Sequence, residues 1–136
     1  MAGDFLHRIR HKGLRDRIVS ADQAAGLIRD GMVLGMSGFT RSGEAKAVPM
    51  ALAERARAEP LKVTLMTGAS LGNDLDKTLT EAHVTARRIP FMSDPSLRRA
   101  INAGEVMYID QHLSETVEQL RTCQLPPVDI AIVEAL

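Results

Sequence analysis

Glycines and hydroxyl side chains gather in one short stretch that has the residue types of a binding loop. The stretch reads Gly35-Met36-Ser37-Gly38-Phe39-Thr40-Arg41-Ser42-Gly43. Glycines let a ligand approach the backbone, and free amides at the start of a following helix can bind anionic or carbonyl oxygens. The stretch matches neither the dinucleotide fingerprint nor the phosphate loop, which requires Gly-Lys-Ser/Thr. On spacing alone, a tight strand-to-helix turn is the simpler interpretation.

The other side chains with catalytic potential stand alone in the sequence. Glu134 ends an apolar run, where an acid bonded to neighbouring amides or to solvent is the favoured interpretation. His112 is isolated, and isolated histidines are usually structural. Cys123 is the single cysteine and has no base beside it, so we interpret it as a packed or surface thiol. No ligand spacing indicates a metal site. The sequence therefore supplies no catalytic residue and no metal ligand.

Length and composition indicate one soluble globular domain spanning residues 1–136. Apolar residues make up 45% of the chain and charged residues 25%, as in ordinary globular proteins. Seventeen basic and seventeen acidic side chains cancel, so the overall charge that attracts nucleic acid is missing. The basic cluster at residues 8–17 is interpreted as a solvated helix face. No apolar run is long enough for a membrane helix or a signal peptide, so we expect a cytoplasmic protein that does not bind membranes. The balanced charge leads us to expect no nucleic-acid partner.

Strand, loop and helix alternate along the chain, which predicts a three-layer α/β fold with a mainly parallel sheet. The weakest strand is residues 84–91, because Arg87 and Arg88 interrupt it and Pro90 lacks an amide hydrogen. Four helix starts carry N-cap signals, at Ser20, Asn73, Asp94 and Ser114. The expected strands are residues 32–36, 61–67, 84–91, 106–109 and 128–133, and the expected helices are residues 21–29 (closed by Gly31), 48–58, 74–82, 95–102 and 115–123.

Several separated motifs also carry a family resemblance. They are residues 35–40 (GMSGFT), 43–49 (GEAKAVP), 65–70 (LMTGAS), 88–94 (RIPFMSD), 101–105 (INAGE) and 110–114 (DQHLS). In this order they resemble the amino-terminal half of the acetyl-CoA hydrolase/transferase family. The resemblance runs from about Ser20 to Leu136. Because members of that family are much longer, and because the chain stops after a strong strand signal, we expect a segment truncated at its carboxyl end.

The resemblance implies the class I coenzyme A transferase fold, with an active site between two related α/β halves. The implied reaction moves coenzyme A between acetyl-CoA or succinyl-CoA and a small carboxylic acid through a glutamyl thioester. Such a reaction needs a carboxylate nucleophile and aligned oxyanion donors in a site sheltered from water. In the family the glutamate comes from the later half, beyond Leu136. The implied partners are acyl-CoA, small carboxylates, the carboxyl-terminal half and further copies of the enzyme, with coenzyme A thioester as substrate and no resident cofactor.

Five residues are the candidate substrate-binding positions. Gly38, Phe39 and Thr40 match the family's first loop and are expected to shape the acyl pocket. Ser70 offers a hydroxyl to a carboxylate or thioester oxygen, and Ser93 stands where the family has a small hydroxyl residue. For both serines a helix-capping role is the competing interpretation. Because each loop follows a predicted strand, we expect residues 37–43, 68–72 and 91–94 to meet at one end of the sheet.

Three classes of function remain open on sequence grounds. A transferase and an acetyl-CoA hydrolase differ in whether an acid or water resolves the thioester, which this half of the sequence does not decide. A non-catalytic acyl-CoA-binding or assembly module is the third class. In each case we expect the chain on its own to lack transferase activity and to expose an apolar sheet face and edge.

Overall fold

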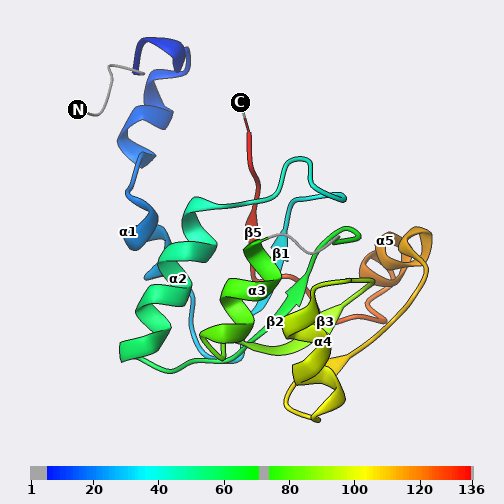
Figure 1. Ribbon diagram of the computed structural model, residues 1–136. Coiled ribbons are helices and arrows are strands. Elements are labelled where there is room, and N and C mark those ends of the chain that lie inside the picture. The colour runs from blue at the N-terminus through cyan, green and yellow to red at the C-terminus, as the bar shows by residue number, and fades with distance from the viewer. Residues whose placement is uncertain (1–5, 71–73, 136) are drawn as a thin grey trace.

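The chain folds into a three-layer α/β domain around a five-stranded, all-parallel sheet (Figure 1). The computed structural model describes residues 6–70 and 74–135. The strand order is β4-β3-β2-β1-β5, which confirms the predicted α/β class and the parallel pairing. The strands are β1 (Val33–Met36), β2 (Val63–Met66), β3 (Thr85–Ile89), β4 (Met107–Tyr108) and β5 (Ile130–Ile132), and the helices are η1 (Leu6–Arg8), η2 (Lys12–Arg17), α1 (Ala21–Ala25), α2 (Ala47–Ala58), α3 (Asp74–Glu81), α4 (Pro95–Asn102) and α5 (Leu113–Arg121).

The order of the strands places the helices on two opposite faces. From β1 to β4 each strand is added on the same side, and right-handed crossovers therefore put α2, α3 and α4 on one face, where Figure 1 shows them in a row. The chain then returns across the sheet to place β5 beside β1, and α5 covers the other face. The sheet consequently has a face covered by α1 to α4 and a face covered by α5, named below the α2 face and the α5 face.

The main core lies on the α2 face. It joins Leu34 and Met36 of β1 to Leu52 of α2 and Leu79 of α3, with Val63 and Leu65 of β2 between them. A smaller core on the α5 face joins Val33, Met66, Ile89 and Leu125. The expected strand at residues 84–91 exists, and β3 is an inner strand despite its arginines, because Arg88 is neutralised within the core.

Two of the cap predictions are confirmed. The Ser20 side chain accepts a hydrogen bond from the Gln23 amide at 3.1 Å and the Gln23 side chain bonds back to the Ser20 amide, which is a complete capping box. The Asp94 carboxylate accepts the Leu97 amide at 2.8 Å, with Pro95 at the first helical position. The Asn73 prediction lies outside the described residues.

The predicted bounds of the first and the last helix are wrong. The first helix ends at Ala25, not at residue 29, because the Arg55 guanidinium binds the carbonyl oxygens of Ala25 and Ile28, each at 2.8 Å, and so satisfies this end. Gly31, with φ of +80°, serves the turn into β1 instead of closing a helix. The last helix spans Leu113–Arg121 instead of residues 115–123, and Ser114 bonds to His112 instead of acting as the N-cap.

The amino-terminal basic cluster lies mostly in solvent, on the short helices η1 and η2. This agrees with its interpretation as a solvated face. Within the described ranges, no helix has the length and apolarity needed to cross a membrane.

Candidate functional site: three loops at the carboxyl ends of the strands

Three strand-end loops meet at the carboxyl edge of the sheet, as the sequence predicted for the part of them that the structure describes. Isolated bridges join Thr40 to Ser70 and Ser70 to Met92. The Thr40 amide donates to the Ala69 carbonyl at 2.7 Å, and the Ser70 amide donates to the Phe91 carbonyl at 3.2 Å. We call residues 37–43, 68–70 and 91–94 the loop cluster. Residues 71 and 72 of the predicted second loop lie outside the described residues.

Glycines permit the close backbone contact at the centre of the loop cluster. A Cβ atom added to Gly68 would collide with the carbonyl oxygen of Gly38. Gly38 itself has φ of +136°, a conformation that side-chain-bearing residues rarely adopt. These glycines therefore serve more than a turn, because they let the first and second loops touch through their backbones.

Ser70 is the most informative polar group in the loop cluster. The residue is 5% exposed, and among the described residues its hydroxyl has no hydrogen-bond partner. Burying an unsatisfied hydroxyl is costly, so such groups are rare and call for an explanation. Ser70 lines a cavity of about 10 Å³ together with Gly38, Thr40 and Glu44, which is room for one water at most. Within the described residues, the Ser70 hydroxyl thus has an unused donor and acceptor at the point where the loops meet.

Glu44 is a buried carboxylate that sequence reasoning missed. It is 7% exposed and lines the same cavity as Ser70. Its backbone packs against Gly38, where an added Cβ would lie 3.2 Å from the Glu44 Cα. A glutamate in a glycine-rich loop carries no sequence signal of burial, because the loop's path over the sheet decides whether the side chain turns inward.

A buried ion pair supports the loop cluster from below. Arg88 and Asp76 are both fully buried, and the Arg88 guanidinium contacts the Asp76 carboxylate at 2.8 Å from Nε and 3.3 Å from Nη2. The same guanidinium donates to the Ile89 carbonyl and to the Thr67 hydroxyl, each at 2.6 Å. Because Thr67 precedes Gly68 directly, this network fixes the start of the second loop.

The five predicted substrate-binding residues fall into two groups. Gly38, Thr40 and Ser70 line the cavity at the centre of the loop cluster. Phe39 belongs to the first loop, but it is 59% exposed and does not line that cavity. Ser93 is half-buried directly after Met92, the residue bridged to Ser70, and Asp94 takes the helix cap that was the competing role for Ser93.

The isolated candidates are held by structural contacts. The Glu134 carboxylate pairs with Lys46 Nζ at 2.6 Å, and its amide donates to the Ser37 hydroxyl at 2.9 Å, in agreement with a strand-end acid. His112 is exposed, and its Nδ1 bonds to the Ser114 hydroxyl at 2.8 Å. Cys123 is an exposed thiol. In the part of the chain that the structure describes, no group of three or more histidine, cysteine or acidic residues is arranged to hold a metal ion.

An open hollow of about 490 Å³ adjoins the loop cluster. It is lined by Ala69, Phe91, Asp110 and His112 together with Gln111 and Leu113. Nearby, burial and the charge of Asp110 raise the pKa of Tyr108 above its ordinary value. The hollow and the cavity at Ser70 share Ala69, so a ligand in the hollow would lie next to the second loop.

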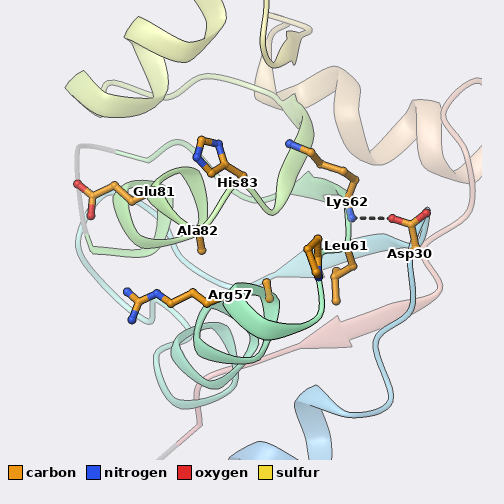
Figure 2. A pocket seen from close by; sticks show the side chains of 9 residues that line it. Asp30, Arg57, Leu61, Lys62, Glu81, Ala82 and His83 are labelled. Atoms are coloured by element: carbon orange, nitrogen blue, oxygen red, sulfur yellow. Dashed lines mark hydrogen bonds between the residues drawn. The ribbon is translucent and has the colours of Figure 1, made fainter.

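A second hollow, of about 510 Å³, lies at the opposite end of the strands (Figure 2). It is bordered by the last residues of α2 and α3 and by the segment leading into β2, where the Asp30 carboxylate accepts the Lys62 amide at 2.7 Å. Its charged residues Arg57, Lys62 and Glu81 are exposed. Of the buried side-chain atoms that lack a partner in the described ranges, none belongs to this hollow, so the loop cluster is the better candidate.

Comparison with known proteins decides the family. The family model described as the acetyl-CoA hydrolase/transferase N-terminal domain matches residues 7–136. The chain belongs to the acetyl-CoA hydrolase/transferase family. It is 44% identical to the succinyl-CoA:acetate CoA-transferase of Clostridium kluyveri, over 95% of this chain and 24% of that protein. It is 34% identical to the propanoyl-CoA:succinate CoA transferase of Escherichia coli, over 86% of this chain and 25% of that protein.

Other members and a solved structure extend the comparison. The acetyl-CoA hydrolase of Yarrowia lipolytica is 30% identical over 99% of this chain and 28% of that protein. The chain thus spans about a quarter of the length of these curated family members. A crystal structure of a variant of the decarboxylase AibA/AibB aligns with a TM-score of 0.56 at 24% identity, over 79% of this chain and 44% of that chain, which shows a shared fold.

Proposed function

We propose that this chain is the amino-terminal part of a coenzyme A transferase that moves coenzyme A between acetyl-CoA or succinyl-CoA and a small carboxylic acid. The loop cluster binds the acyl or carboxylate group, and a glutamate outside this chain attacks the thioester. Residues 1–136 act as one domain of that enzyme. The transferase is favoured over the hydrolase because the 44% identity to a transferase exceeds the 30% identity to a hydrolase.

The observation that carries the proposal is the buried hydroxyl of Ser70, which has no partner among the described residues. A hydroxyl held in place without a competing bond is preorganised to donate to an oxygen that gains charge during acyl transfer. Gly38 and Thr40, on the facing loop, shape the space in front of it. Phe39 and Ser93 extend the surface toward the acyl chain and the incoming acid.

Ser70 is a donor in this proposal and not a nucleophile. A serine attacks effectively only when a base accepts its proton, and no histidine or lysine lines the cavity beside it in the described part of the chain. Glu134 is engaged with Lys46. The 136-residue chain alone is therefore expected to have no transferase activity.

The test uses a chimera in which this chain replaces the matching stretch of the Clostridium kluyveri enzyme. Turnover is measured with succinyl-CoA and acetate, and hydrolysis is measured with acetate omitted. We expect acetate-dependent transfer, and a fall in kcat/KM of about 10²–10³ for Ser70→Ala, as for loss of one oxyanion donor. Ser96→Ala, which removes a hydroxyl that contacts Arg99 on α4, is the matched control and should retain full activity.

Three results would contradict parts of this proposal. Equal activity of Ser70→Ala and Ser96→Ala would remove Ser70 from the site. Thioester loss that proceeds without acetate at the rate seen with acetate would favour the hydrolase. Robust transfer by the 136-residue chain alone would place the chemistry in this part of the enzyme.

A further inference from the structure

The α5 face of the sheet carries an apolar trough that no helix of the described residues covers. The trough has a volume of about 370 Å³, and its lining includes Gly35, Met66, Leu120, Val128, Ala131 and Val133. Helix α5 borders the trough on one side only, with Thr116 and Leu120. On the other side Ala131 is exposed and Val133 is 69% exposed. The part of this face above β1 and β5 therefore lacks the helical layer that parallel sheets normally have.

The floor of the trough is shaped for close approach of a backbone. Gly35 and Ala131 are register partners on the adjacent strands β1 and β5, and both face the trough. Two small residues side by side leave a depression, which Val128 borders, since an added Cβ on Gly35 would lie 3.2 Å from its Cγ1. A helix with an apolar stripe can lie in such a depression and bury its side chains against Met66 and Leu120.

The right-handedness of parallel crossover connections indicates that a helix following β5 would lie over the trough. The step from β4 to β5 runs in the direction opposite to the steps from β1 to β4, and it places α5 on the α5 face. A further strand added at the free edge of β5 would continue in that same direction. Because such connections are right-handed in about 98% of cases, the helix leading to it would lie on the α5 face, over β1 and β5.

The residues after β5 are held in the position that this path requires. The Ser37 amide donates to the Ile132 carbonyl at 2.9 Å, and Glu134 is fixed by Ser37 and Lys46. The chain therefore leaves the sheet beside the first loop of the loop cluster, at the carboxyl edge (Figure 1). A helix that starts there and returns along the sheet passes over Val133 first and then over Ala131.

We propose that this trough is the seat of an amphipathic helix that follows β5 in the longer members of the family and leads to a sixth parallel strand on the free edge of β5. The occupant is thus the polypeptide that those members carry after the stretch matched here, which makes up most of their length. This inference depends on membership of the family and not on the reaction proposed for it.

The experiment measures the reactivity of a single engineered thiol with a maleimide reagent. Ala131→Cys is introduced into a Cys123→Ser background, both in the 136-residue chain and in the chimera with the Clostridium kluyveri enzyme, and labelling at residue 131 is followed by peptide mass spectrometry. We expect rapid labelling in the chain and labelling at least tenfold slower in the chimera. The matched control is Ala103→Cys, an exposed alanine after α4, at the opposite edge of the sheet, which should label equally in both.

Each outcome decides for or against the proposal. Equal labelling of residue 131 in chain and chimera would overturn it, because the trough would be open in the complete protein. Protection of residue 131 in the chimera that disappears on dilution would make a second copy the occupant and would also overturn it. A chimera that transfers coenzyme A but labels freely at residue 131 would refute this inference while leaving the proposed function standing.

Discussion

Removing one partner of the Arg88–Asp76 pair should cost this domain a large share of its stability. Both side chains are fully buried, and the Asp76 carboxylate accepts two bonds from the Arg88 guanidinium. In Asp76→Asn the arginine keeps its charge in the core without a counter-charge. Breaking a buried pair in this way costs about 3–5 kcal/mol.

The effect is measured by urea denaturation followed by circular dichroism. With an m-value of about 2 kcal/mol/M, a loss of about 3–5 kcal/mol lowers the midpoint by about 1.5–2.5 M. The control is Glu54→Gln, which breaks the exposed Glu54–Arg57 pair and should change stability by no more than about 0.5 kcal/mol.

A double substitution tests the physical reason. Arg88→Met combined with Asp76→Leu removes both charges, and the Ile89 carbonyl keeps the bond that it accepts from the Thr67 amide at 3.1 Å. The double variant should therefore be more stable than either single variant, since hydrophobic replacement of a buried pair is often neutral. Two results would contradict the explanation that Asp76→Asn leaves the Arg88 charge buried without a counter-charge. One is a urea midpoint for Asp76→Asn equal to that of the control within error, and the other is a double variant less stable than both single variants.

Two further predictions concern the loop cluster and its neighbourhood. Gly68→Ala should separate the first two loops, because the added methyl group meets the Gly38 carbonyl; we expect loss of transfer activity in the chimera of at least tenfold with the far-ultraviolet spectrum retained, and unchanged activity would contradict the tight contact. Since burial raises the pKa of Tyr108 in the folded state, its neutral form contributes stability that is present below the ordinary pKa of 10 and is lost as pH rises through the higher folded value. Thermal melts between pH 9 and 11 should therefore show a steeper loss of stability for the wild type than for Tyr108→Phe, and parallel curves would count against it.

Capping residues and the alternation of strands and helices in the sequence determine much of the fold. The capping box at Ser20 and the Asp94-Pro95 start are satisfied within a few residues, so their geometry is encoded locally. The alternation of strands and helices predicted the parallel sheet, and parallel pairing in turn predicted that the strand-end loops would meet. The end of α1 was wrong because it depends on Arg55, about thirty positions away in sequence.

Some features of the candidate site were predictable from the sequence, and others depend on tertiary contacts. The motif around Ser70 and the glycines at 38 and 68 were visible in the sequence, because residue type and order carry the family resemblance and the capacity for a tight approach. Only the tertiary structure decided that the Ser70 hydroxyl is buried without a partner in the described residues, that Glu44 turns inward, and that Arg88 finds Asp76. Burial and pairing are properties of distances between segments far apart in the chain, and a linear pattern of residue types does not contain those distances.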